Sequence, residues 1–207
     1  MAFSGFTQHD FDTFHIEGLE GRMEAIRERI QPKFKAISDE LLQELSVQAG
    51  EELFLHIAQH ARRTVNAPVD TWMAFAGNKR GYKQHPHFQI GLFDDHVFIW
   101  LALIYELPNK PNIASAFLRQ LSEFTTLPPE MVLSFDHMKK EHVTLQELGE
   151  QGLIQALERF RDVKKVEFLI GRTIAANDAE LLQGDRFLEL AKHTFQQLLP
   201  LYRIAKL

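Results

Sequence analysis

Hydrophobic positions in the first fifty residues recur every three to four residues, which is the period of an amphipathic α-helix. The positions that follow this spacing are Leu19, Met23, Ile26 and Ile30. Pro32 lacks a backbone donor and is expected to interrupt this helix. Ser38 is then expected to begin a second helix. Residues 1–50 are therefore predicted to form a helical N-terminal segment.

A different pattern follows, with short segments rich in aromatic and β-branched residues, separated by Gly, Pro, Asn and Asp. These segments are Thr71–Ala76, His87–Leu92 and Val97–Tyr105. They predict consecutive antiparallel strands, and the short Phe93–His96 stretch fits a hairpin turn. The preceding segment, Glu52–Arg63, fits a strand or a helix, and we favour a strand. Residues 51–107 are thus predicted to be the strand-rich core.

Helical and strand patterns alternate from residue 108 to residue 207. Strands are predicted at Met131–Phe135 and Val166–Ile174, and helices at Ile113–Phe124, Thr144–Phe160 and Phe187–Leu198. Thr144 and Glu147 match a capping box, whereas Gly149 and Gly152 disturb the helical pattern that follows. The order of predicted helices and strands along the chain indicates one α+β domain spanning 1–207. Its central sheet is expected to be mostly antiparallel and covered by N-terminal and C-terminal helices.

Composition excludes several classes of protein. The 207 residues carry a formal net charge of −5, which argues against a nucleic-acid coat protein or a binder of anionic membranes. The absence of Cys excludes disulfides, thiol nucleophiles and thiolate metal sites. The longest apolar run, Val97–Tyr105, is far shorter than the roughly 20 residues of a membrane helix. No signal peptide is visible at the N-terminus, so a cytoplasmic protein without a membrane segment is expected.

Positive charge is concentrated in one region. Between Phe54 and Phe93 there are five fixed cations and one acid, a net charge of +4, so the rest of the chain carries −9. A local patch of this sign is a candidate site for an anionic ligand. The candidate ligand-binding residues in this region are His56, His60, Arg62, Arg63, Lys79, Arg80, Lys83, His85 and His87.

Strand alternation places several of these residues together. If the segment from Phe54 onward is a strand, His56, His60 and Arg62 point to one side, because side chains alternate with period two. His87 would share a face with Gln89 on another strand. A helix or loop covering that face would make the imidazoles line a pocket.

The turn Asn78–Lys83 is the most distinctive local feature, because three cations flank Gly81 there. Backbone N–H groups and long cationic side chains in such a turn can surround a phosphate or a carboxylate. Arg172, near the end of a later strand, is a further candidate. The leading hypothesis is therefore a protein that binds a small anionic ligand, with the cations neutralising it and the histidines orienting it.

Three alternatives remain open at this level. One of His56, His60 or His87 could act as general acid or base of an enzyme. The basic face could instead dock a protein or RNA, although the net charge disfavours nucleic acid. The histidines could also be a satisfied polar layer beneath a loop.

Other chemical patterns are weak. His85 and His87 could both bind a metal from a strand, but the region offers only Asp70 as a further ligand, so no metal is predicted. No phosphate-binding loop or dinucleotide fingerprint is present, and no cofactor is predicted. The residue types of a hydrolase triad occur at Ser134, Asp136 and His137, yet they lie too close in sequence for those roles.

Three segments resemble those of the YktB-like bacterial proteins. They read HIAQHARRTVNAPVDTW (His56–Trp72), NKRGYKQHPHFQIGL (Asn78–Leu92) and VEFLIGR (Val166–Arg172). The resemblance extends over nearly the whole chain. It implies a single cytoplasmic α+β domain in which the segment after Gly50 belongs to the sheet. It implies no activity, because the function of that family is unknown.

Overall fold

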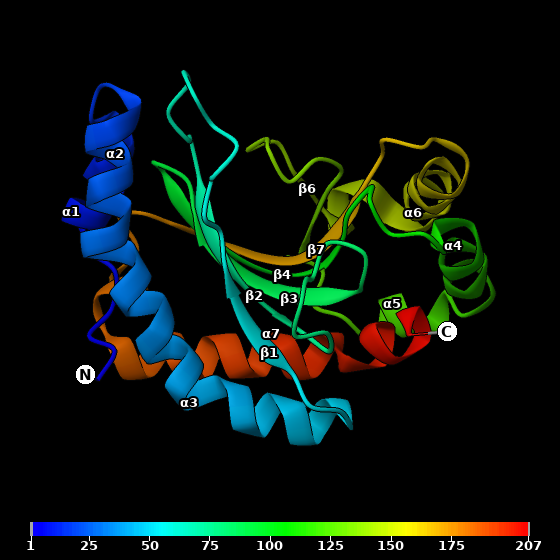
Figure 1. Ribbon diagram of the computed structural model, residues 1–207. Coiled ribbons are helices and arrows are strands. Elements are labelled where there is room, and N and C mark those ends of the chain that lie inside the picture. Colours follow the sequence, from blue (N-terminus) through cyan, green and yellow to red (C-terminus); the bar gives the residue numbers. More distant parts are fainter. Residues whose placement is uncertain (1, 207) are drawn as a thin grey trace.

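A seven-stranded antiparallel sheet forms the centre of the computed structural model, which describes residues 2–206 (Figure 1). The strand order is β1-β2-β3-β4-β7-β5-β6. The strands are β1 (Phe54–Ile57), β2 (Thr71–Ala76), β3 (His87–Leu92), β4 (His96–Leu103), β5 (Val132–Ser134), β6 (Val143–Thr144) and β7 (Phe168–Ala175). Strands β1 to β4 are neighbours both in sequence and in space, whereas β7 inserts between β4 and β5.

Helices cover one face and the ends of this sheet (Figure 1). They are α1 (Gln8–Phe11), α2 (Leu19–Ala25), α3 (Gln31–Ala49), α4 (Lys110–Arg119), α5 (Ser122–Thr125), α6 (Leu145–Asp162) and α7 (Gly184–Ala205), with 3₁₀ turns at Asp12–His15 and Ala179–Leu182. Helices α3 and α7 lie side by side beneath the sheet, and α4 packs against α6. N-terminal and C-terminal helices thus pack around an antiparallel sheet, and the predicted α+β class is confirmed.

Side-chain alternation divides the sheet into two faces. The helix face carries buried apolar residues such as Phe75, Phe88 and Ile90. The Phe88 ring stacks on Tyr202 of α7 at 4.7 Å and lies 5.0 Å from Phe195, which joins the sheet to that helix. Burying one such side chain contributes about 1.5–3 kcal/mol to folding. The predicted apolar side of the strands is therefore the side that the helices cover.

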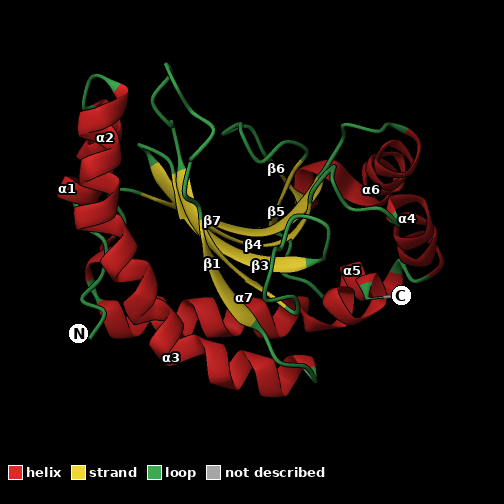
Figure 2. Ribbon diagram, in the orientation of Figure 1, coloured by secondary structure: helices red, strands yellow, loops and turns green. Residues whose placement is uncertain are grey.

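The opposite face, here called the loop face, is covered by connections rather than by helices. The strand register places five large or polar side chains on this face: His56, Trp72, His87, Gln89 and Trp100. The connections 58–70, 77–86 and 135–142 are drawn as loops in Figure 2. Polar side chains of the strands and of these loops meet on this face, so the candidate chemistry lies here.

The N-terminal helices differ from the prediction. Pro32 does not separate two helices, because α2 runs into a π-helical turn at Ile26–Ile30 and then directly into α3. Pro32 follows this π-helical turn directly, as the second residue of α3, so the irregularity in the helix lies just before the proline. Ser38 is a buried residue within α3 and begins no helix.

Other boundaries also need correction. The predicted helix Ile113–Phe124 is two helices, α4 and α5, with a break at Gln120 and Leu121. Strand β1 ends at Ile57, and His60 has a φ of +48°, so the predicted strand does not continue to Arg62. The capping box is confirmed, since the Glu147 N–H group donates to Thr144 Oγ1 at 3.1 Å. None of the helices between residues 2 and 206 is long and apolar enough to cross a membrane.

Candidate functional site

The turn between β2 and β3 folds over the loop face through Tyr82. Its hydroxyl oxygen accepts a hydrogen bond from Trp72 Nε1 at 2.9 Å. The Tyr82 ring lies 5.3 Å from the ring of His56 and 4.9 Å from that of His87. Burial raises the pKa of Tyr82 to about 12, so the hydroxyl keeps its proton at neutral pH. Tyr82 can therefore still donate a hydrogen bond to another acceptor.

Two histidines of the strands hold this turn in place. His56 Nε2 donates to the carbonyl oxygen of Asn78 at 2.9 Å, and His87 Nδ1 donates to that of His85 at 2.7 Å. The amide of Gln89 donates to His87 Nε2 at 2.9 Å. Burial lowers the pKa of His87 to about 3, so this ring is neutral and both of its nitrogens are engaged. His87 is thus a satisfied polar group beneath a loop, as one of the alternatives anticipated.

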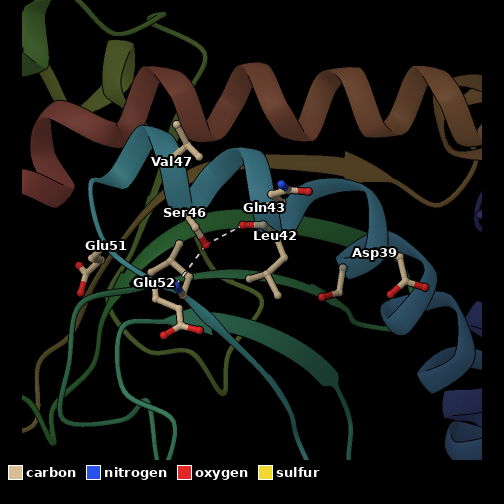
Figure 3. A pocket seen from close by; sticks show the side chains of 9 residues that line it. Asp39, Leu42, Gln43, Ser46, Val47, Glu51 and Glu52 are labelled. Carbon is tan, nitrogen blue, oxygen red and sulfur yellow. Dashed lines mark hydrogen bonds between the residues drawn. The ribbon is translucent and has the colours of Figure 1, made fainter.

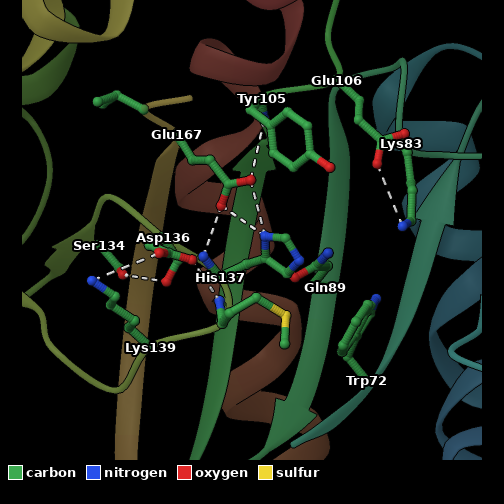
Figure 4. Close-up of polar contacts among 12 residues, drawn as sticks. Trp72, Lys83, Gln89, Tyr105, Glu106, Ser134, Asp136, His137, Lys139 and Glu167 are labelled. Atoms are coloured by element: carbon green, nitrogen blue, oxygen red, sulfur yellow. Dashed lines mark hydrogen bonds and ion pairs between the residues drawn. The ribbon is translucent and has the colours of Figure 1, made fainter. Parts of the chain in front are cut away.

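A cleft of about 460 Å³ opens beside the turn. Its lining residues are His56, Asn78, Arg80, Gly81, Tyr82, Lys83, Gln84, His85 and Glu106. The charged residues of the lining are two cations, Arg80 and Lys83, and one carboxylate, Glu106. The Oε1 atom of Glu106 lies 3.5 Å from Lys83 Nζ (Figure 4). The fixed charges of the lining therefore leave an excess of one positive charge. We call this the basic cleft.

The predicted ligand-binding residues are only partly brought together. His56, Arg80, Lys83 and His85 line the basic cleft. Arg62 and Lys79 are exposed and lie outside its lining, while Arg172 belongs to the helix face and forms an ion pair with Glu130 at 3.2 Å. The remaining three, His60, Arg63 and His87, also lie outside the lining. Four of the ten predicted ligand-binding residues therefore line one cleft, and six lie outside it.

His60 and Arg63 lie toward another part of the loop face, around Asp70. His60 Nε2 is 3.2 Å from Thr71 Oγ1, and its ring meets the edge of Trp72 at 5.5 Å. Burial lowers the pKa of His60 to about 4, and the charge of Arg63 adds to this effect. Asp70 is fully buried, and neither of its carboxylate oxygens has a hydrogen-bond partner among residues 2–206.

Burial is also the main cause of the shifted pKa of Asp70. It raises the pKa of this carboxyl to about 6, although the charges of His137 and Arg63 oppose the shift. Trp100 Nε1 is a second buried polar atom of the loop face that is unpaired within the described chain. Buried polar groups without partners are uncommon and often mark functional sites.

A carboxylate–imidazole pair also lies on the loop face, and no sequence pattern predicted it. Glu167 is 2% exposed, and its oxygens lie 2.7 and 2.9 Å from His137 Nδ1 (Figure 4). The same carboxylate accepts the backbone N–H groups of His137 at 2.7 Å and Tyr105 at 3.2 Å. Burial disfavours the charged imidazole, but the hydrogen bond and charge of Glu167 outweigh it and raise the pKa of His137.

Asp136, His137 and Glu167 each offer one ligand atom, and these atoms lie within 4.8 Å of one another. Such a group can in principle hold a divalent cation. Here, however, the Glu167 oxygens already accept two backbone N–H groups and the ring of His137. The observed arrangement is that of a carboxylate that orients an imidazole, and we assign no metal to it.

Two other clefts lack the cationic lining that an anion-binding site needs. One, of about 570 Å³, lies between α3 and the start of β1 and is lined by Asp39, Glu51 and Glu52 (Figure 3). Ser46 connects its two walls, because it accepts the Leu53 N–H group and donates to the carbonyl of Leu42. The other, of about 320 Å³, lies between α5 and α6 and is mostly apolar. An acidic lining repels anions, so the basic cleft remains the candidate site although it is smaller than the acidic one.

Comparison with known proteins identifies the family. Residues 6–202 match the family described as "Domain of unknown function (DUF1054)". The chain is 57% identical to a UPF0637 protein of Oceanobacillus iheyensis, over 98% of this chain and 97% of that one. It is 47% identical to a UPF0637 protein of Listeria welshimeri, over 99% of each chain. The predicted resemblance is confirmed: the chain belongs to this YktB-like family, DUF1054, whose function is uncharacterised.

Proposed function

We propose that the protein binds a small, singly charged anion, such as a phosphodiester or a carboxylate, in the basic cleft. The observation that carries the proposal is the convergence of Arg80 and Lys83 on one cleft with a single opposing carboxylate, Glu106. The excess of one positive charge matches one negative charge on the ligand. Long cationic side chains donate charge-assisted hydrogen bonds to phosphate and carboxylate oxygens.

Neighbouring groups support this chemistry. The Arg80 N–H group donates to Asn78 Oδ1 at 2.8 Å, which fixes the turn that carries both cations. The Tyr82 hydroxyl already accepts a bond from Trp72, so its own hydrogen is available to a ligand oxygen. His56 is kept in one tautomer by the carbonyl of Asn78. A preorganised site of this kind loses less entropy when the ligand binds.

Isothermal titration calorimetry with dimethyl phosphate and with acetate tests the proposal. The wild-type protein should bind at least one of these ions, and the double variant Arg80→Ala/Lys83→Ala should lose at least tenfold in affinity. Lys79→Ala is the matched control, because it removes an exposed cation of the same turn that does not line the cleft. Equal affinity of the wild-type protein and the double variant, or an equal loss in the control, would refute a site in this cleft.

A further inference from the structure

We propose that His137 is the acid–base residue of a phosphodiester hydrolase, acting on the ester bound in the basic cleft; this inference rests on the proposed function. It also assigns Glu167 as the group that positions His137. The sequence alone suggests His56, His60 or His87 for this role, and the proposed residue lies outside that set.

The geometry of the pair supports the assignment. Glu167 accepts the Nδ1 hydrogen of His137 at 2.7 Å, which leaves Nε2 as the basic nitrogen. Figure 4 shows this second nitrogen directed away from Glu167, on the side where Gln89 lies. No residue between 2 and 206 forms a hydrogen bond with it, and the side chain is 13% exposed. A carboxylate that fixes tautomer and orientation of an imidazole is a recurrent arrangement in acid–base catalysis.

The pair is connected to the basic cleft through neighbouring residues. Tyr105 and Glu106 are consecutive: the Tyr105 N–H group binds Glu167, and the Glu106 carboxylate lies in the cleft beside Lys83. A second connection runs through the loop face, where the ring of Trp72 lies 5.7 Å from that of His137 and its Nε1 donates to Tyr82 in the cleft wall. Trp72 and the segment Tyr105–Glu106 therefore each contact the pair and connect it to a residue of the cleft lining.

The other histidines of this face are less suited to proton transfer. Both ring nitrogens of His87 are engaged, and its pKa lies far below neutrality because of burial. His56 donates its Nε2 hydrogen to a backbone carbonyl, and burial lowers its pKa as well. His137 is the histidine of this face whose pKa is raised, because Glu167 outweighs the effect of burial. A raised pKa makes the neutral imidazole a stronger base.

The reaction balances with water as the second substrate. Nε2 of His137 takes a proton from water while the water oxygen forms a bond to phosphorus. The bond from phosphorus to the leaving oxygen breaks, and its electron pair stays on that oxygen. The proton is then passed from Nε2 to the leaving group or to solvent, so the diester and water give a monoester and an alcohol. Arg80 and Lys83 would stabilise the charge on the phosphoryl oxygens.

Hydrolysis of bis(p-nitrophenyl) phosphate, a diester with one negative charge, provides the test. We expect release of p-nitrophenolate by the wild-type protein at a rate that increases with pH, because the base must be deprotonated. His137→Gln should lower this rate at least about 100-fold, as expected for loss of a general base. His142→Gln, an exposed histidine of the same loop, is the matched control and should leave the rate unchanged.

A second variant separates catalysis from folding. Glu167→Gln keeps an acceptor for Nδ1 but removes the charge, so it should move the midpoint of the pH–rate profile to lower pH. A merely structural role of the pair would change thermal stability without moving that midpoint. Absence of hydrolysis by the wild-type protein, or equal rates for wild type and His137→Gln, would refute the inference.

The two proposals fail in distinguishable ways. Binding of dimethyl phosphate without hydrolysis would overturn the role of His137 and leave the anion site standing. Hydrolysis that depends on His137 but survives Arg80→Ala/Lys83→Ala would support the acid–base role and overturn the basic cleft as its binding site.

Discussion

Trp72 Nε1 and the hydroxyl of Tyr82 are joined by a hydrogen bond of 2.9 Å that fastens the turn between β2 and β3 to the sheet. Trp72 belongs to a strand, and Tyr82 belongs to the loop that carries the two cations of the basic cleft. The position of Arg80 and Lys83 therefore depends on a contact in the interior of the loop face.

Removing this hydroxyl should weaken the fold. Tyr82→Phe leaves the indole N–H group of Trp72 without its acceptor at a site that is 7% exposed. The unpaired donor should lower the free energy of unfolding by about 1–3 kcal/mol. Urea unfolding followed by Trp fluorescence measures this change. Unaltered stability would show that the hydrogen bond does not hold the turn.

Asp70 should be a source of instability at neutral pH. Its folded pKa of about 6 lies above the unfolded value of 3.8, so the folded protein holds the proton more tightly. Its contribution to stability is therefore present below pH 4 and is lost as pH rises through 6. Asp70→Asn should raise the free energy of unfolding by roughly 1–3 kcal/mol at pH 7. The gain should disappear near pH 4, and a gain that is the same at both pH values would contradict this account.

His87 should make the fold sensitive to acid. Its folded pKa of about 3 lies below the unfolded value of 6.5, so the unfolded chain binds the proton more readily. Stability from the neutral ring is present above pH 6.5 and is lost as pH falls toward 3. Unfolding of the wild type and of His87→Gln, measured between pH 7 and pH 4.5, should show the wild type losing roughly 1–3 kcal/mol more. Parallel pH curves would argue against a neutral, fully buried His87.

Lys110 should stabilise the contact between α4 and the connection from α6 to β7. Its Nζ atom donates to the carbonyl oxygens of Val163 at 3.1 Å, Lys164 at 2.9 Å and Val166. Lys110→Met keeps the length of the side chain but leaves these acceptors unpaired, which should cost about 2–4 kcal/mol. Thermal unfolding monitored by circular dichroism measures the loss. Lys164→Met, a neighbouring exposed lysine, is the control and should have little effect.

The central strands were predictable because their signals are local. Alternation in His87–Leu92 separates the apolar Phe88, Ile90 and Leu92 from the polar His87 and Gln89, and the structure confirms both faces. The hairpin at Phe93–His96 was likewise predictable, and the Phe93 N–H group donates to the His96 carbonyl at 3.0 Å. Pro32 misled the prediction because its effect depends on its position within a helix, which the spacing of apolar residues does not reveal.

In the candidate site, too, contacts between consecutive strands were predictable and contacts between distant segments were not. His56 and the Asn78–Lys83 turn meet because β1, β2 and β3 are consecutive, so sequence alternation places them together. The pair of His137 and Glu167 depends on the pairing of β5 with β7, which are separated by α6. No local pattern announces such a contact. Ser134, Asp136 and His137 lie too close in sequence for a hydrolase triad, and the carboxylate that orients His137 lies thirty residues away in sequence.

The most direct test of the basic cleft is a titration of ¹⁵N-labelled protein with dimethyl phosphate, followed by amide chemical shifts. The account predicts saturable shifts concentrated on Asn78, Gly81 and Lys83, with the amide of Glu52 in the acidic cleft unmoved. The Arg80→Ala/Lys83→Ala variant should show none of these shifts at the same concentrations. Shifts that centre on another surface, or that persist in this variant, would contradict the claim that the cleft binds an anion.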